Sequence, residues 1–118
     1  MTSKKEMEKM IKDMASQLRL CISALGMASD VLNDHQPWLI QHFETLIEEI
    51  EIIVMTEQSM VFDDVASKLR ITASALELAQ SYMTPEQAND FDQIIADDRE
   101  LAAKIRQMLK EMEEGIRD

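Results

Sequence analysis

A repeated segment constrains the fold of this chain more than any other feature of its sequence. The 17 residues Ser16 to Leu32 recur 51 positions later as Ser67 to Met83, and extending the alignment back to Met10 and Val61 gives nine identities in 23 positions. The identical pairs are Asp13/Asp64, Ala15/Ala66, Ser16/Ser67, Leu18/Leu69, Arg19/Arg70, Ser23/Ser74, Ala24/Ala75, Leu25/Leu76 and Ala28/Ala79. Because several of these residues are polar, a shared apolar period does not explain the agreement. The sequence therefore predicts an internal duplication of one helical unit.

The composition indicates helices. The chain has only two Gly, two Pro and 4% aromatic residues, and it is rich in Met, Leu, Ile, Ala, Glu and Lys, which is typical of helical proteins. A length of 118 residues suits one domain that is large enough to bury a core. We therefore expect a single domain over residues 1–118.

The first half of the chain reads as two helices. Apolar residues recur every three or four positions from Met7 to Leu32, which predicts one helix ending at Leu32. Ser3 and Glu6 have the spacing of a capping box at its start. Pro37 suits the first turn of a second helix, which continues to about Thr56.

The boundary between the second and third helices is the weakest. Residues 56–59 are polar but contain neither Gly nor Pro, and Ser59 can cap a helix that starts at Met60. A continuous helix from Pro37 to Met83 is the alternative, and it would require a dimer of long helices. The segment Thr84–Gln87 combines a Thr N-cap, Pro at the first position and Gln at the third, which predicts the start of a last helix. Gly115 is its predicted stop.

The last helix resembles the second when the two are aligned with a shift of 48. Phe43 and Phe91 coincide, as do Ile47 and Ile95. The repeated unit is then a helical hairpin, with one copy over residues 3–56 and the other over 59–116. We predict an all-α fold: an up-down-up-down four-helix bundle built from two duplicated helical hairpins, with an over-long fourth helix.

This topology gathers eight of the ten methionines at the end of the bundle that holds both termini. Methionine is common at surfaces that adapt to partners. The fourth helix is predicted to extend about 12 residues, roughly 18 Å, beyond the second, so that its apolar stripe lacks cover. The predicted interface comprises Met7, Met10, Ile105, Met108, Leu109, Met112 and Ile116. An uncovered stripe favours homodimerisation or a partner site; the alternative is that these are ordinary core residues.

The charge is strongly negative. A net charge of −11 argues against binding to nucleic acid or to an anionic membrane, and it favours a basic protein as partner. No Lys or Arg lies between Leu20 and Ser67. The predicted acidic surface comprises Glu44, Glu48, Glu51, Asp90 and Asp97. It is either a solvated face that maintains solubility or a decoy that occupies the nucleic-acid site of a basic protein.

A polar pattern on the first helix recurs on the third. Ser-Arg-Ser stripes centred on Arg19 and Arg70 lie on outward faces, and each arginine could hold a small anion. Alternatively the stripes are a relic of duplication, with each arginine paired to a neighbouring acid.

Three single residues also carry predictions. Asp98 falls on the apolar seam of the last helix, where it sets the register, meets Thr72 or reaches water. Cys21 is expected to be a small buried hydrophobe. Trp38 is expected to plug the end of the bundle.

The residues needed for catalysis are missing from the sequence. Neither His35 nor His42 has a Glu three residues before it, as a di-iron bundle requires. Zinc-ligand spacing and a phosphate-binding glycine loop are also absent. We expect no enzyme activity, no metal and no cofactor.

The start of the chain helps to predict the cellular compartment of the protein. Its first residues lack the apolar stretch of a secretion signal, and no run approaches membrane-spanning length. A cytoplasmic, non-enzymatic interaction module, acting as a small regulator or adaptor, is the resulting prediction.

Overall fold

The computed structural model describes residues 3–32, 36–56 and 60–117, the last two of these as backbone only. It contains α1 (Lys4–Leu32), α2 (Pro37–Met55), α3 (Phe62–Gln80) and α4 (Pro85–Arg117), and the described residues form no strand. The prediction of an all-α, four-helix fold is confirmed.

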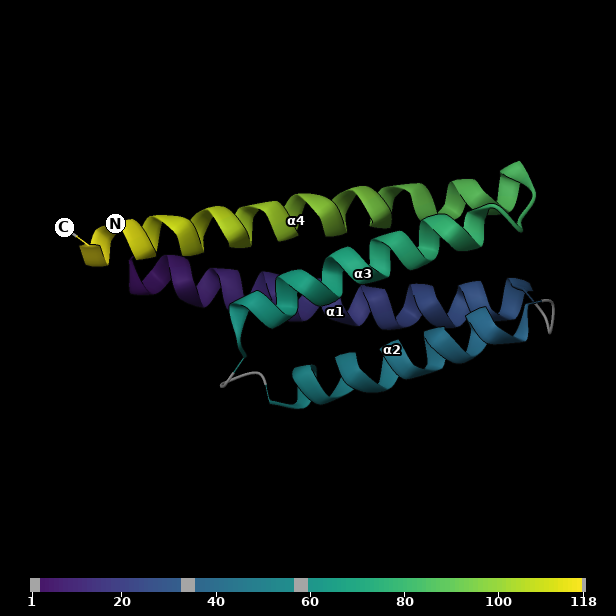
Figure 1. The fold of residues 1–118 in the computed structure, drawn as a ribbon, viewed down its shortest axis with the longest axis horizontal. Helices are drawn as coiled ribbons and strands as arrows, with labels where there is room; N and C mark the ends of the chain where they lie inside the picture. The colour runs from purple at the N-terminus through teal and green to yellow at the C-terminus, as the bar shows by residue number, and fades with distance from the viewer. Residues whose placement is uncertain (1–2, 33–35, 57–59, 118) are drawn as a thin grey trace.

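The helices form an elongated bundle that measures 52 × 26 × 21 Å. Successive helices run in alternate directions, so both ends of the chain lie at the same end of the bundle (Figure 1). Helix α1 contacts the other three helices, whereas α2 and α4 lie on opposite sides of the α1–α3 pair. Because α1 and α4 have 29 and 33 residues and α2 and α3 have 19 each, the two longer helices project together beyond the shorter ones.

Two helix starts follow the capping pattern of the sequence. The Ser3 hydroxyl accepts a hydrogen bond from the Glu6 backbone N–H at 3.1 Å. At α4, the Thr84 hydroxyl accepts from the Gln87 N–H at 3.2 Å, while the Gln87 side chain accepts from the Thr84 N–H at 3.1 Å. These bonds satisfy backbone donors that a helix start leaves without an intrahelical partner, and both predicted starts are confirmed.

Helices α2 and α3 are separate, so the alternative of a continuous helix is wrong. The predicted start at Met60 is also wrong, because α3 begins at Phe62 with Val61 as its N-cap in an extended conformation. The first turn of α3 carries Asp63 and Asp64, and negative charge at that position interacts favourably with the helix dipole. Ser59, the predicted cap, lies outside the described residues.

The ends of α4 and α2 correct two further predictions. Helix α4 continues past Gly115 to Arg117, and Gly115 does not adopt a left-handed conformation. Trp38 does not plug the bundle end, since it is 54% exposed and its indole N–H donates to the side chain of Gln36. Gln36 itself takes a left-handed backbone at the start of α2, with φ of 63°, which turns the chain into that helix.

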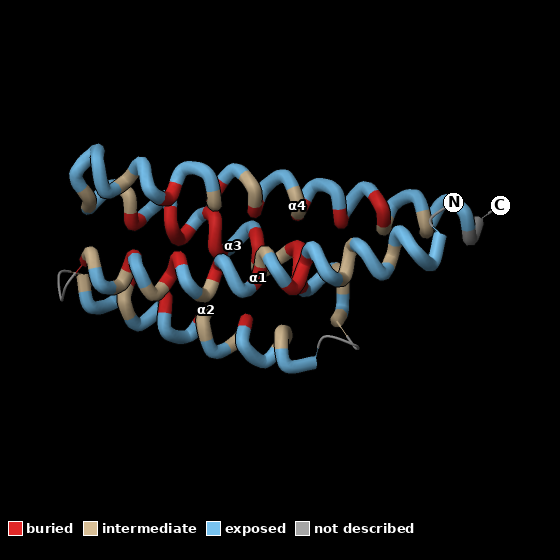
Figure 2. The backbone as a smooth tube through the Cα atoms, turned by 180° about the vertical axis from the view of Figure 1, so that it is seen from behind, coloured by how far each residue is buried: buried red, intermediate tan, exposed pale blue. Residues whose placement is uncertain are grey.

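The core follows the predicted apolar period. Buried residues line the inner faces of all four helices (Figure 2). On α1 they include Leu18, Cys21, Leu25 and Ala28, and on α3 the residues 51 positions later are buried as well. The agreement suits a duplicated unit, but any two helices with this period would bury the same positions. The duplication therefore stays a prediction.

Candidate interaction surfaces

The methionine-rich end is the end of the bundle where α1 and α3 begin and α2 and α4 end. Of the predicted interface residues, Ile105 and Met108 are buried, at 0% and 8% exposure. Four others, Met7, Met10, Leu109 and Met112, are partly exposed, and the side chain of Ile116 lies outside the described residues. The expectation that the stripe lacks cover is wrong at Ile105 and Met108, because α1 starts at Lys4 and runs beside α4 to the end of the bundle (Figure 1).

The most exposed apolar side chains at this end differ from the predicted interface residues. Met55 is 84% exposed, Ile52 63% and Val61 56%. Ile52 and Met55 lie in the last turn of α2, and Val61 is the N-cap of α3. None of the three belongs to the predicted interface. Their exposure could have been predicted from their position beside the short polar segment, because no further helical turn follows there to cover them.

Charge is unevenly distributed along the bundle. No Lys or Arg occurs in residues 20–66 or 71–98, and the fold brings parts of both segments to the end opposite the termini (Figure 1). The methionine-rich end instead carries both signs, with four Lys and two Glu in residues 4–12. Helix α2, which ends here with Ile52 and Met55, adds no Lys or Arg to this end.

The predicted acidic residues do not form one surface. Glu44, Glu48 and Glu51 are exposed on α2, while Asp90 and Asp97 belong to α4, with Asp97 partly buried. These two helices lie on opposite sides of the bundle. The basic-protein partner and the decoy function stay predictions.

A buried polar cluster links α1 and α4. The Asp98 carboxylate is fully buried; its Oδ1 accepts hydrogen bonds from the Gln17 side chain at 2.7 Å and from the Cys21 thiol at 3.2 Å. Asp98 Oδ2 and Thr72 Oγ1 are buried without a hydrogen-bond partner. The prediction that Asp98 reaches water at the helix edge is therefore wrong, and Asp98 accepts no hydrogen bond from Thr72.

Burial governs the protonation of this cluster. It raises the pKa of Asp98 from 3.8 to about 6, and the hydrogen bonds from Gln17 and Cys21 offset only part of the effect. Burial, followed by the nearby Asp98 charge, also raises the pKa of the Cys21 thiol far above its usual range. Since the thiolate is the reactive form, this shift disfavours reactions of Cys21. The predicted burial of Cys21 is confirmed, whereas its hydrogen bond to Asp98 was not predicted.

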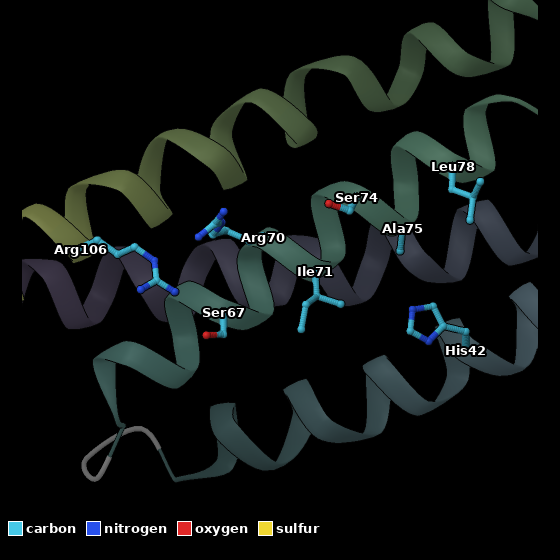
Figure 3. A pocket seen from close by; sticks show the side chains of 8 residues that line it. All are labelled: His42, Ser67, Arg70, Ile71, Ser74, Ala75, Leu78 and Arg106. Carbon is cyan, nitrogen blue, oxygen red and sulfur yellow. The ribbon is translucent and has the colours of Figure 1, made fainter.

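The two Ser-Arg-Ser stripes have different surroundings. Arg19 and its two serines are exposed on α1. Ser67, Arg70 and Ser74 line a groove of about 520 Å³ on the outer face of α3, together with His42 from α2 and Arg106 from α4 (Figure 3). The structure does not bring Arg19 and Arg70 to one site. The approach of His42 and Arg106 to the second stripe could not be read from the sequence.

Among the described residues, no three His, Cys, Asp or Glu side chains are grouped so that they could hold a metal ion. A membrane-crossing helix is likewise not found within the described segments. Comparison of the chain with protein-family models, curated proteins and solved structures gives no match.

Proposed function

We propose that this protein is a non-enzymatic interaction module that self-associates through its methionine-rich end. The observation that carries the proposal is the exposure of Ile52, Met55 and Val61 in a single chain. A contiguous exposed apolar patch is typical of an interaction surface, and Ile52 and Met55 are neighbours on one face of α2 because they are three residues apart. The same end of the bundle also carries flexible methionines near the start of α1 and the end of α4, among them Met7 and Met112, which can adjust to a facing surface.

A second copy of the chain suits this end on electrostatic grounds. In a two-fold dimer the same patch of each subunit faces its copy, so the interface must not bring like charges of the two subunits together. The projecting part of α1 carries Lys4 and Lys9 beside Glu6 and Glu8, so that each sign can face the other. The opposite end, made by parts of residues 20–66 and 71–98, has no Lys or Arg and would repel itself. The end of α2 that holds Ile52 and Met55 also lacks Lys and Arg, so the lysines of α1 in the second copy have to face it. Regulation of another protein by such a dimer is part of the proposal.

The test is the oligomeric state of a double variant, Ile52→Glu with Met55→Glu. We expect the wild-type chain to form dimers in size-exclusion chromatography with light scattering, and the variant to be monomeric, because two buried carboxylates per subunit would oppose association. Both positions are exposed in the single chain, so the fold should tolerate the change. The matched control is Met27→Glu, which alters a methionine that is 54% exposed outside this end.

The control should leave the dimer intact. A wild-type chain that stays monomeric at high concentration would contradict self-association. Equal dissociation by Met27→Glu would mean that added negative charge, rather than this surface, controls assembly. Circular dichroism of each variant checks that the helices are retained.

A further inference from the structure

The groove on the outer face of α3 has a cationic part and an apolar part. Arg70 and Ser67 lie at one end of the groove, and Arg106 reaches from α4 toward Ser67 (Figure 3). Ile71 and Leu78 lie farther along α3. Positions 67, 71, 74 and 78 follow steps of four, three and four residues, which places them on one face of the helix.

The cationic part is available to a ligand. Arg70 is exposed and makes no hydrogen bond or ion pair within the described part of the chain. Arg106 has one contact, at 3.3 Å with Asp63, and both side chains of that pair are exposed, at 43% and 65%. Such surface pairs contribute little and exchange easily. No residue that lines the groove is Asp or Glu, although the chain has a net charge of −11.

The apolar part can hold side chains of a partner. Ile71 is 40% exposed and Leu78 42% exposed, and they are seven residues, or two helical turns, apart. Ala75 lies between them in the groove wall. Apolar residues at this spacing are the usual anchors for an amphipathic helix laid into a groove.

We infer that this groove binds an acidic amphipathic helix of a partner protein, with its carboxylates on Arg70 and Arg106 and its apolar side chains on Ile71 and Leu78. Arginine holds a carboxylate through two parallel hydrogen bonds, and the hydroxyls of Ser67 and Ser74 can donate to further side-chain oxygens.

Other occupants fit this groove less well. A small anion would contact the arginines but would leave Ile71 and Leu78 uncovered. A nucleic acid would need many more cations than two arginines, and the strongly negative chain would repel it. An acidic helix uses both parts of the groove and carries only a few charges. The groove lies apart from Ile52 and Met55, so this inference does not depend on self-association.

The test uses a fluorescein-labelled synthetic helix of Glu, Leu and Ala, titrated with the full chain and followed by fluorescence anisotropy. We expect binding to weaken roughly tenfold or more in the double variant Arg70→Glu with Arg106→Glu, because two attractive charge pairs become repulsive. The matched control is Arg19→Glu, which changes the arginine of the other Ser-Arg-Ser stripe and should leave the affinity unchanged. Two comparison peptides replace either every Glu by Lys or every Leu by Ser, and both should bind more weakly.

Four results would overturn the inference. The first is absence of binding by the Glu–Leu helix, and the second is an equal loss in Arg19→Glu. The third is unchanged affinity for the peptide without Leu. The fourth is displacement of the peptide by inorganic phosphate at a concentration where chloride has no effect, which would indicate a site for small anions. Because both substituted arginines are exposed, circular dichroism should show an unchanged fold.

Discussion

The sequence alignments pair α1 with α3 and α2 with α4, so the α1–α4 contact corresponds to the α2–α3 contact. Each of these contacts contains an acidic side chain, but the two side chains lie in different surroundings. At α2–α3, Glu49 lies at the edge of the contact and pairs with Lys68, with both side chains partly exposed. At α1–α4, Gln17 stands in the place of Lys68 and donates to Asp98, which is fully buried. The α2 residue that corresponds to Asp98 is Ile50, an apolar core residue.

The difference shows that a shift of one position along a helix decides whether a carboxylate is hydrated or buried. Consecutive residues of a helix are rotated by roughly 100° about its axis. One of them can therefore lie at the solvent-exposed edge of a helix contact while the next lies in its buried centre. Glu49 keeps much of its hydration, whereas Asp98 loses it and has a raised pKa of about 6. The α1–α4 contact therefore lowers stability at neutral pH and makes stability depend on pH.

The largest expected effect comes from Asp98→Asn, which removes the buried charge and so makes the α1–α4 contact more like the α2–α3 contact. A shift of the pKa from 3.8 to about 6 corresponds to about 3 kcal/mol against the charged form. We therefore expect the free energy of unfolding at neutral pH, measured by urea denaturation, to rise by about 2 kcal/mol once an imperfectly bonded amide is allowed for.

The matched control is the neighbouring Asp97→Asn. Asp97 is partly exposed and accepts a hydrogen bond from Gln93 at 2.8 Å, so its loss should change the unfolding free energy by less than about 0.5 kcal/mol. An Asp98 variant no more stable than wild type would mean that the carboxylate is better solvated in solution than its burial implies.

The second effect is a pH dependence that separates the two contacts. A carboxyl whose pKa is higher in the folded state binds more protons there, so stability rises as the pH falls through the folded value. From the values of 3.8 and about 6 for Asp98, the wild-type chain should gain roughly 2 kcal/mol relative to Asp98→Asn between pH 7.5 and pH 4.5. Denaturation curves of both proteins across this range measure the difference, and parallel curves would disprove the raised pKa.

The sequence predicts the parts of this fold that depend on local chemistry. The capping residues Ser3, Thr84 and Gln87 marked two helix starts, because a capping box needs only neighbours within one turn. The apolar period placed Asp98 on the seam, since burial on a helix repeats every three or four residues. Val61 was missed as the N-cap of α3 because it makes no side-chain capping bond.

Features that depend on the packing of distant helices could not be predicted. Gln17 bonds to Asp98 across 81 positions, and that contact depends on how far each helix is rotated about its axis. Cover over Met108 depended on where α1 starts relative to α4. The groove on α3 requires Arg106 and His42 to approach α3 from two other helices, which no spacing within one segment encodes.

The smallest expected effect comes from Lys68→Gln, which gives the α2–α3 contact the residue that α1 carries at the equivalent position. The side chains of Lys68 and Glu49 are 24% and 43% exposed, so water screens their attraction. We expect a loss of about 0.5 kcal/mol in unfolding free energy at low salt and less at high salt, measured by urea denaturation. A loss several times larger, or one that salt does not reduce, would show that Lys68 acts through the packing of its carbon chain against α2, because apolar contacts are not weakened by screening.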